Sequence, residues 1–218
     1  MNSNKYASEF IGTFLLVLAV VGSGIMGENL ASGNMAVALL ANSIATGAAL
    51  YVLIHVFGPT SGAHFNPAVS LFFFFKRALS AKQATCYALA QITGGVLAVF
   101  VTHFIFDLNA FQFSQKARDG SPLFISEVIA TLGLLLTIIG FSNRARESTP
   151  VGVALYITGA YWFTSSTSFA NPAVTIARIF TDTFSGIAPH SAPLFILAQL
   201  LAVGIMLLLI KARPAFFS

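Results

Sequence analysis

Two copies of the tetrapeptide Asn-Pro-Ala-Val have the residue types and spacing that indicate chemistry. The copies are Asn66, Pro67, Ala68, Val69 and Asn171, Pro172, Ala173, Val174. Asparagine is a favoured N-cap and proline is favoured at the first helical position, so each copy predicts the start of a short helix. We expect these short helices over about 66–76 and 171–180. Each asparagine amide also offers N–H donors to a small polar molecule.

The composition predicts that these helices lie in a membrane. Of 218 residues, 56% are hydrophobic and only 8% are charged, and the mean hydropathy is +0.84. Soluble domains are about 25% charged, so this chain has too few charges for a soluble surface. The high hydrophobic content also excludes a disordered chain, and the single cysteine, Cys86, excludes a disulfide scaffold. The net charge of +4 is spread too thinly along the chain to bind a nucleic-acid partner. The chain is predicted to contact a lipid bilayer.

Long stretches without Asp, Glu, Lys or Arg predict six membrane-spanning helices. A spanning helix needs about 20 apolar residues. The predicted spans are 6–26, 35–57, 82–105, 122–142, 150–166 and 190–211. The two Asn-Pro-Ala segments are too apolar for loops and too short to cross, so we expect half-helices that enter the membrane without crossing it. Irregular backbone at that depth is tolerated where it is buried in protein or lines a watery cavity.

Basic residues predict the orientation of the chain. With both termini in the cytoplasm, that side holds Lys5, Lys76, Arg77, Lys82, Arg144, Arg146, Lys211 and Arg213. The opposite side then holds Lys116, Arg118 and Arg178. This bias favours cytoplasmic termini.

The chain also contains an internal repeat. Glu9 and Glu127 both lie in the pattern Ser-Glu-x-x-x-Thr at the start of a predicted span. Residues 1–105 and 122–213 then each run span, span, half-helix, span. Three spans per half is an odd number, so the second half must cross the membrane in the opposite direction. Inverted repeats place the functional site near the midplane, where broken helices meet. We interpret 1–218 as one all-α membrane domain.

The motifs resemble those of the aquaporin, or major intrinsic protein, family. The segment 61–68, Ser-Gly-Ala-His-Phe-Asn-Pro-Ala, is similar to the first signature of that family, and Glu9 and Glu127 match its buried glutamates. The resemblance implies a passive channel with six spans and two half-helices, usually as a homotetramer. The segments 21–29 and 171–178 look like a bacterial branch linked to arsenical handling, which implies a bacterial inner membrane.

Opposed half-helices would exclude ions. Each helix N-terminus carries roughly half a positive charge, so two of them at the pore centre repel cations. A water molecule held by Asn66 and Asn171 must point its oxygen at them, which interrupts proton transfer. Neutral solutes escape both effects.

By resemblance, selectivity is set at a constriction where the family normally has an arginine directly after the second Asn-Pro-Ala. The family spacing places the constriction at Thr46, Gly159, Ser168 and Val174. None of these residues is charged or aromatic, so we expect a wide constriction. The expected solutes are water, glycerol-like polyols and undissociated metalloid acids such as arsenite. A channel mainly for water is the alternative.

Other residues have two interpretations each. Arg178 either supplies the charge missing at Val174 or suits the negative end of its half-helix. Glu9 and Glu127 are either proton relays or braces for the half-helices. His64 is either a pH gate or a loop support.

A secondary transporter would need an ionisable pair at the midplane. No catalytic set, metal site or cofactor is predicted.

Overall fold

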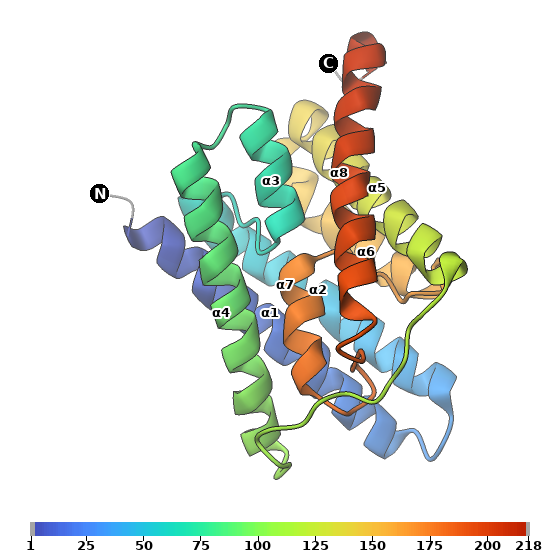
Figure 1. The fold of residues 1–218 in the computed structure, drawn as a ribbon. Helices are drawn as coiled ribbons and strands as arrows, with labels where there is room; N and C mark the ends of the chain where they lie inside the picture. Colours follow the sequence, from blue (N-terminus) through green and yellow to red (C-terminus); the bar gives the residue numbers. More distant parts are fainter. Residues whose placement is uncertain (1–2, 217–218) are drawn as a thin grey trace.

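The computed structural model describes residues 3–216, and this part of the chain is helical with connecting loops (Figure 1). The long helices are α1 (Ser3–Leu30), α2 (Met35–Ser61), α4 (Ala81–Ile105), α5 (Ser121–Arg144), α6 (Thr149–Phe163) and α8 (Ala192–Ala212). Two shorter helices, α3 (Pro67–Phe75) and α7 (Pro172–Ala177), lie among them. Single 3-10 turns are η1 (Arg146–Ser148), η2 (Arg178–Phe180) and η3 (Pro214–Phe216). The all-α fold class predicted from the sequence is confirmed.

Five of the long helices are long and apolar enough to cross a membrane. The exception is α6, which has 15 residues and ends at Phe163 rather than at the predicted residue 166. Thr164 adopts extended backbone (φ −111°, ψ 132°), so the helix stops there. At about 1.5 Å per residue, α6 spans only about 22 Å.

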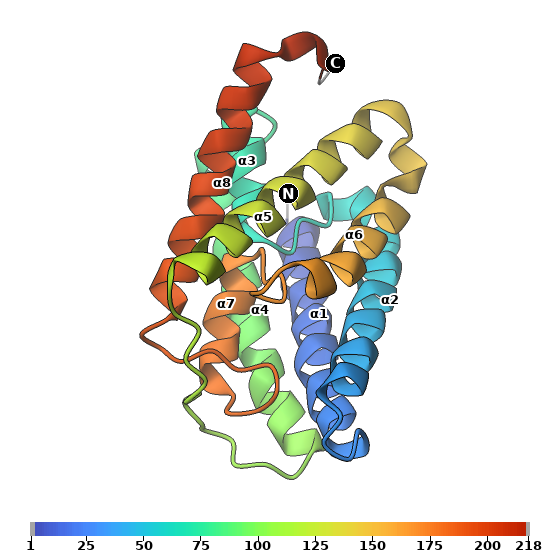
Figure 2. The ribbon, with the colours of Figure 1, turned by 90° about the vertical axis from the view of Figure 1, so that its right-hand side faces the viewer.

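The short helices begin as the Asn-Pro pairs predict. Asn66 and Asn171 are the N-caps of α3 and α7, and each side-chain oxygen accepts a hydrogen bond from a backbone N–H of the first turn. Proline follows at the first helical position in both cases. With nine and six residues, α3 and α7 are too short to cross a membrane. Figures 1 and 2 show them one above the other within the bundle of long helices.

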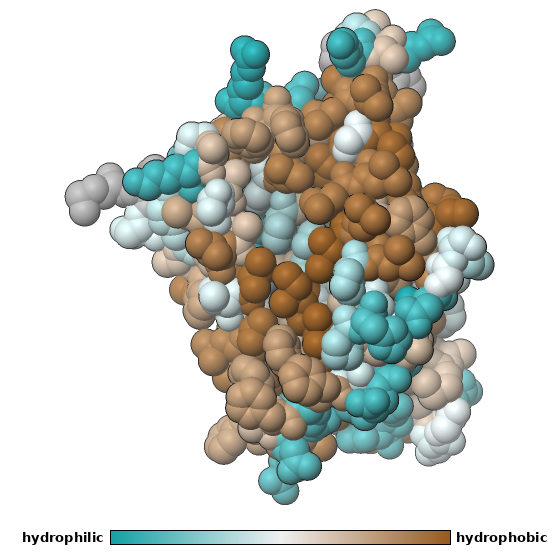
Figure 3. Space-filling model, viewed as in Figure 1, coloured by the Kyte–Doolittle hydropathy of each residue, from teal (hydrophilic) through white to brown (hydrophobic). Residues whose placement is uncertain are grey.

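The long helices surround the short ones. α1 packs against α2 and α4, α5 packs against α6 and α8, and α2 packs against α6. Gly94 permits the close approach of α4 to α1, because a Cβ atom there would lie 2.4 Å from the carbonyl oxygen of Phe10. Figure 3 shows an apolar band across the middle of one face, with hydrophilic residues gathered toward the two ends. This distribution is that of a helical bundle whose outer surface contacts lipid.

Candidate channel site

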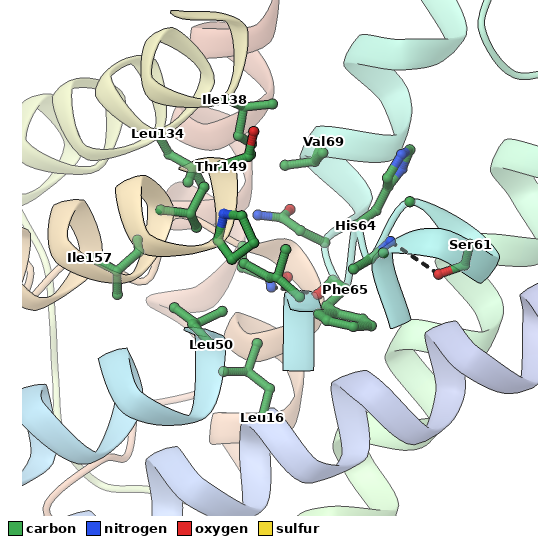
Figure 4. A pocket seen from close by; sticks show the side chains of 18 of the residues that line it. Leu16, Leu50, Ser61, His64, Phe65, Val69, Leu134, Ile138, Thr149 and Ile157 are labelled. Atoms are coloured by element: carbon green, nitrogen blue, oxygen red, sulfur yellow. Dashed lines mark hydrogen bonds between the residues drawn. The ribbon is translucent and has the colours of Figure 1, made fainter. Parts of the chain in front are cut away.

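A cavity of 1120 Å³ runs from one end of the bundle into its centre. Its mouth lies where α2 ends and α6 begins, and it is lined there by Lys5, His55, Arg146, Glu147 and Thr149. Farther in, the wall is mainly apolar; Figure 4 shows Leu16, Leu50, Leu134, Val69 and Ile157 around the cavity. Both Asn66 and Asn171 line it. The two motifs predicted to meet at the centre therefore do border one space.

The two asparagines hold the opposed loops together. Nδ2 of Asn66 donates to the carbonyl oxygen of Ala170 at 2.7 Å, and Nδ2 of Asn171 donates to the carbonyl oxygen of Phe65 at 2.7 Å. Both asparagines are at most 5% exposed. Each amide group has two N–H donors, so one donor remains for a molecule in the cavity.

The loops that precede the two asparagines have the same unusual backbone. Ala63 and Phe65 have φ values of 49° and 48°, and Ser168 and Ala170 have φ values of 49° and 47°. In each loop, the two positions lie three residues and one residue before the asparagine. Residues other than glycine rarely adopt this left-handed conformation, so each loop must be held by its surroundings.

Two buried glutamates hold these loops. Glu9 accepts hydrogen bonds from the backbone N–H groups of His64 at 3.0 Å and Phe65 at 2.7 Å. It also accepts from Ser61 Oγ at 2.6 Å and Gln91 Nε2 at 2.7 Å. These contacts support the interpretation of Glu9 as a brace.

Glu127 makes the equivalent contacts in the second half. It accepts from the backbone N–H groups of Phe169 at 2.8 Å and Ala170 at 2.9 Å, and from Gln199 Nε2 at 2.7 Å. Glu127 has no exposed surface. The repeat therefore extends beyond the motifs to the side chains that position them.

The residues predicted for the constriction lie only partly together. Thr46, Ser168 and Val174 line the cavity near Asn171. Gly159 does not, and its assignment to the constriction is wrong: it is an exposed position of α6 at which an added Cβ would meet only Phe163, at 3.9 Å. Tyr161 lines the cavity instead, and its hydroxyl lies 3.2 Å from Thr46 Oγ1.

Arg178 also lines this end of the cavity. It is the C-cap of α7, yet its side chain is only 2% exposed and turns inward. The guanidinium carbon lies 3.4 Å from the centroid of the Phe169 ring, and Nε donates to the carbonyl oxygen of Ser185. The four residues expected at the constriction are neither charged nor aromatic, whereas Arg178 and Tyr161 also line this end of the cavity.

His64 lines the inner part of the cavity (Figure 4). Its Nδ1 lies 3.1 Å from Ser70 Oγ, and its ring stacks on Phe73 with a centroid distance of 4.9 Å. The ring also lies edge-on to Tyr87. These contacts tie the loop before α3 to α3 itself, as the loop-support interpretation requires.

Several residues of the site are not among those predicted from the sequence. Gln91, Gln199 and Tyr161 are buried polar side chains in apolar helices, and their isolation among apolar residues is the sequence signal that marks them. Phe169 and Arg118 carried no such signal, because their contacts join segments far apart in the sequence.

A membrane bundle with a cavity that leads to two opposed half-helices defines a channel rather than an enzyme. The family model described as Major intrinsic protein matches residues 1–168. Aquaglyceroporin AqpS of Rhizobium meliloti (strain 1021) is 48% identical over 217 residues, which cover 97% of this chain and 93% of that protein. The chain therefore belongs to the major intrinsic protein family, and it is an integral, multi-pass membrane protein.

Further similarities agree with this assignment. Aquaporin Z of Rhodopseudomonas palustris (strain ATCC BAA-98 / CGA009) is 28% identical over 79% of this chain and 78% of that protein. The X-ray structure of the aquaglyceroporin from Plasmodium falciparum superposes with a TM-score of 0.76 and covers 94% of each chain. At 20% identity, this structural similarity supports the fold alone.

Proposed function

We propose that the chain is a passive channel for water, glycerol-like polyols and undissociated metalloid acids such as arsenite. The main support for this proposal is the cavity, because it leads from one end of the bundle to Asn66 and Asn171 along a mainly apolar wall. Thr46, Tyr161 and Ser168 add hydroxyl groups near its inner end. Small neutral molecules with hydroxyl groups match such a surface, and the name of the relative aquaglyceroporin AqpS agrees with that class.

Ions and protons are excluded at the junction of α3 and α7 in this proposal. The N-termini of both helices face the centre, and each contributes roughly half a positive charge. The free N–H groups of Asn66 and Asn171 orient the oxygen of a passing water molecule toward them. A chain of water molecules is thereby interrupted as a path for protons, whereas a neutral solute passes without this cost.

The selectivity constriction in this proposal consists of Thr46, Tyr161, Ser168 and Val174. These residues line the inner end of the cavity together with Arg178. Because Val174 is small, the opening at its level is wider than an arginine there would leave.

Val174→Arg tests this constriction. Stopped-flow assays on proteoliposomes are expected to show glycerol and arsenite uptake reduced on the order of tenfold, with a smaller loss of water permeability, because the larger solutes need more width. Val174→Met serves as a control for side-chain length without charge. Unchanged glycerol and arsenite uptake in a folded Val174→Arg variant would show that the constriction lies elsewhere.

The proposal includes the arrangement of the chain in its membrane. Residues 1–105 and 122–213 form two inverted repeats of one channel domain, with both termini in the cytoplasm of a bacterium and the chain in its inner membrane. The excess of basic residues on the side of the membrane that holds both termini supports this orientation. A homotetramer with one pore per subunit follows from the family resemblance, and light scattering of the purified protein tests it.

A secondary transporter is the alternative class. It would couple solute movement to an ion through an ionisable pair at the midplane. The oxygens of Glu9 and Glu127 accept hydrogen bonds from the loops before α3 and α7, which favours a bracing role over an exchange of protons. Flux that saturates and depends on an ion gradient would support the transporter.

A further inference from the structure

Two buried arginines converge on the ring of Phe169. The guanidinium carbon of Arg178 lies 3.4 Å from the ring centroid, and that of Arg118 lies 5.0 Å from it. Arg178 is 2% exposed and Arg118 is 9% exposed. Among residues 3–216, no carboxylate lies within salt-bridge distance of either guanidinium. Burying two cations without a carboxylate partner is costly, so this arrangement requires a compensating interaction or a function.

Arg178 is held in one orientation by contacts from two loops. Its Nε donates to the carbonyl oxygen of Ser185, and its guanidinium carbon lies over the ring of Phe169. Phe169 stands two residues before Asn171, and its backbone N–H donates to Glu127, which holds this part of the loop in place. Hydrogen bonds from the Nη atoms of Arg178 to residues 3–216 are absent, and the side chain lines the cavity. Those N–H groups are therefore available to molecules in the cavity.

Arg118 connects a third segment to the same ring. It lies in the connection between α4 and α5, where its backbone N–H donates to Ser191 Oγ at 3.1 Å. Its Nε donates to the carbonyl oxygen of Gly186 at 3.0 Å, and its Nη1 donates to the carbonyl oxygen of Ser166 at 3.4 Å. Arg118 does not line the cavity. Its contacts instead fasten the loops on both sides of Phe169.

We propose that Arg178 is the specificity-determining cation of the pore and that Arg118 is a positioning residue, which acts by holding Phe169 beneath Arg178. The proposal rests on the proposed channel function. Arg178 comes from the turn after α7, four residues beyond Val174, so its charge enters the pore at a different level from that of Val174. The charge repels protons and metal cations, while the pore at Val174 stays wide enough for polyols. The Nη groups donate hydrogen bonds to oxygen atoms of neutral solutes.

Arg178→Gln tests the charge directly. Proteoliposomes with a clamped membrane potential and an internal pH dye measure proton conductance, and stopped-flow light scattering measures glycerol permeability. The ratio of proton conductance to glycerol permeability is expected to rise on the order of tenfold or more, because a nearby unit charge acts strongly in a partly buried site. A ratio within twofold of wild type in folded Arg178→Gln would overturn the proposal.

A second pair of variants leaves Arg178 in place. Val174→Glu puts a carboxylate one helical turn from Arg178 and neutralises its field, whereas Val174→Gln adds nearly the same volume without charge. The ratio of proton conductance to glycerol permeability is expected to be on the order of tenfold higher in Val174→Glu than in Val174→Gln. Equal ratios would overturn the role of Arg178, even if Arg178→Gln fails to fold.

Double substitution tests the role of Arg118. Arg118→Gln is expected to raise the same ratio by less than Arg178→Gln does, and Arg118→Gln/Arg178→Gln is expected to match Arg178→Gln alone, because the two residues act through one ring. Arg144→Gln, at an exposed position at the end of α5, should keep the wild-type ratio. Fully additive effects, or lower folded yield without a change in the ratio, would overturn the positioning role.

Wild-type vesicles separate this inference from the proposed function. Glycerol permeability no higher than that of protein-free liposomes would contradict the channel function. Normal wild-type permeability with an unchanged ratio in the variants would instead overturn the assignment of Arg178.

Discussion

Asn66 and Asn171 bind each other's loops through matching hydrogen bonds. The Nδ2 atom of each donates to the carbonyl oxygen of the residue just before the other asparagine, and both distances are 2.7 Å. Oδ1 of each accepts the first free N–H of its own half-helix, at 2.9 Å in both cases. Each asparagine therefore caps a helix, joins the two halves of the molecule and keeps one N–H for the cavity.

Removing either asparagine side chain is expected to destabilise the protein by about 2 kcal/mol, because a cap and a buried cross-loop hydrogen bond are lost together. Asn66→Ala and Asn171→Ala should behave alike, and thermal unfolding in detergent measures the effect. Asn34→Ala is the matched control, since Asn34 is an exposed N-cap of α2 without a contact to a distant loop. A loss in Asn34→Ala as large as in Asn66→Ala would show that the cross-loop bond contributes little.

Glu127→Gln is expected to destabilise the loop before α7. A carboxylate only accepts hydrogen bonds, and Glu127 faces three N–H donors, from Phe169, Ala170 and Gln199. The amide nitrogen of glutamine turns one acceptor into a donor, which leaves a buried N–H unpaired at a cost of about 1–3 kcal/mol. Unfolding by heat measures the loss, with the exposed Glu147→Gln as control. Equal stability of these two variants would contradict the bracing role.

Mercurials are expected to leave the wild-type channel open. Cys86 is the single cysteine of the chain, and it does not line the cavity. Ser168 does line it, so Ser168→Cys should make water permeability sensitive to mercury, because a bound metal ion narrows the pore. Stopped-flow shrinkage of vesicles gives the readout. Block of the wild-type protein that disappears in Cys86→Ser would show that the pore is assigned to the wrong place.

Asp119 gives a pH dependence at the rim of the bundle. Hydrogen bonds from Ser191 Oγ at 2.6 Å and from His190 Nε2 at 3.1 Å hold the pKa of the Asp119 carboxyl below its usual value of 3.8. A carboxylate whose pKa is lower in the folded state stabilises that state above pH 3.8, and this contribution disappears as the pH falls through the lowered pKa. Wild type should therefore unfold at a higher temperature than Asp119→Asn at neutral pH.

The difference in unfolding temperature between wild type and Asp119→Asn should shrink as the medium becomes more acidic. A series of thermal unfolding curves between neutral pH and pH 3 measures this difference. A difference that grows toward acid would contradict the assigned direction of the pKa change.

Local patterns determined most of the fold. Apolar stretches without charge specify spanning helices because unpaired backbone groups cannot face lipid, and the six predicted spans correspond to α1, α2, α4, α5, α6 and α8. The Asn-Pro pairs specify where α3 and α7 begin, because capping and the fixed φ of proline act within one helical turn. The sequence by itself therefore determined the helices, their order and the two asparagines of the site.

The tertiary structure alone decided which side chains face the cavity. Gly159 and Tyr161 differ by two positions, or about 200° around a helix, and a spacing counted along the chain does not specify how α6 is rotated. Packing against α2 turns Tyr161 toward Thr46 and Gly159 outward. The inward turn of Arg178 likewise depends on Phe169 and Ser185. Such contacts join distant segments, so they exist only once the chain has folded.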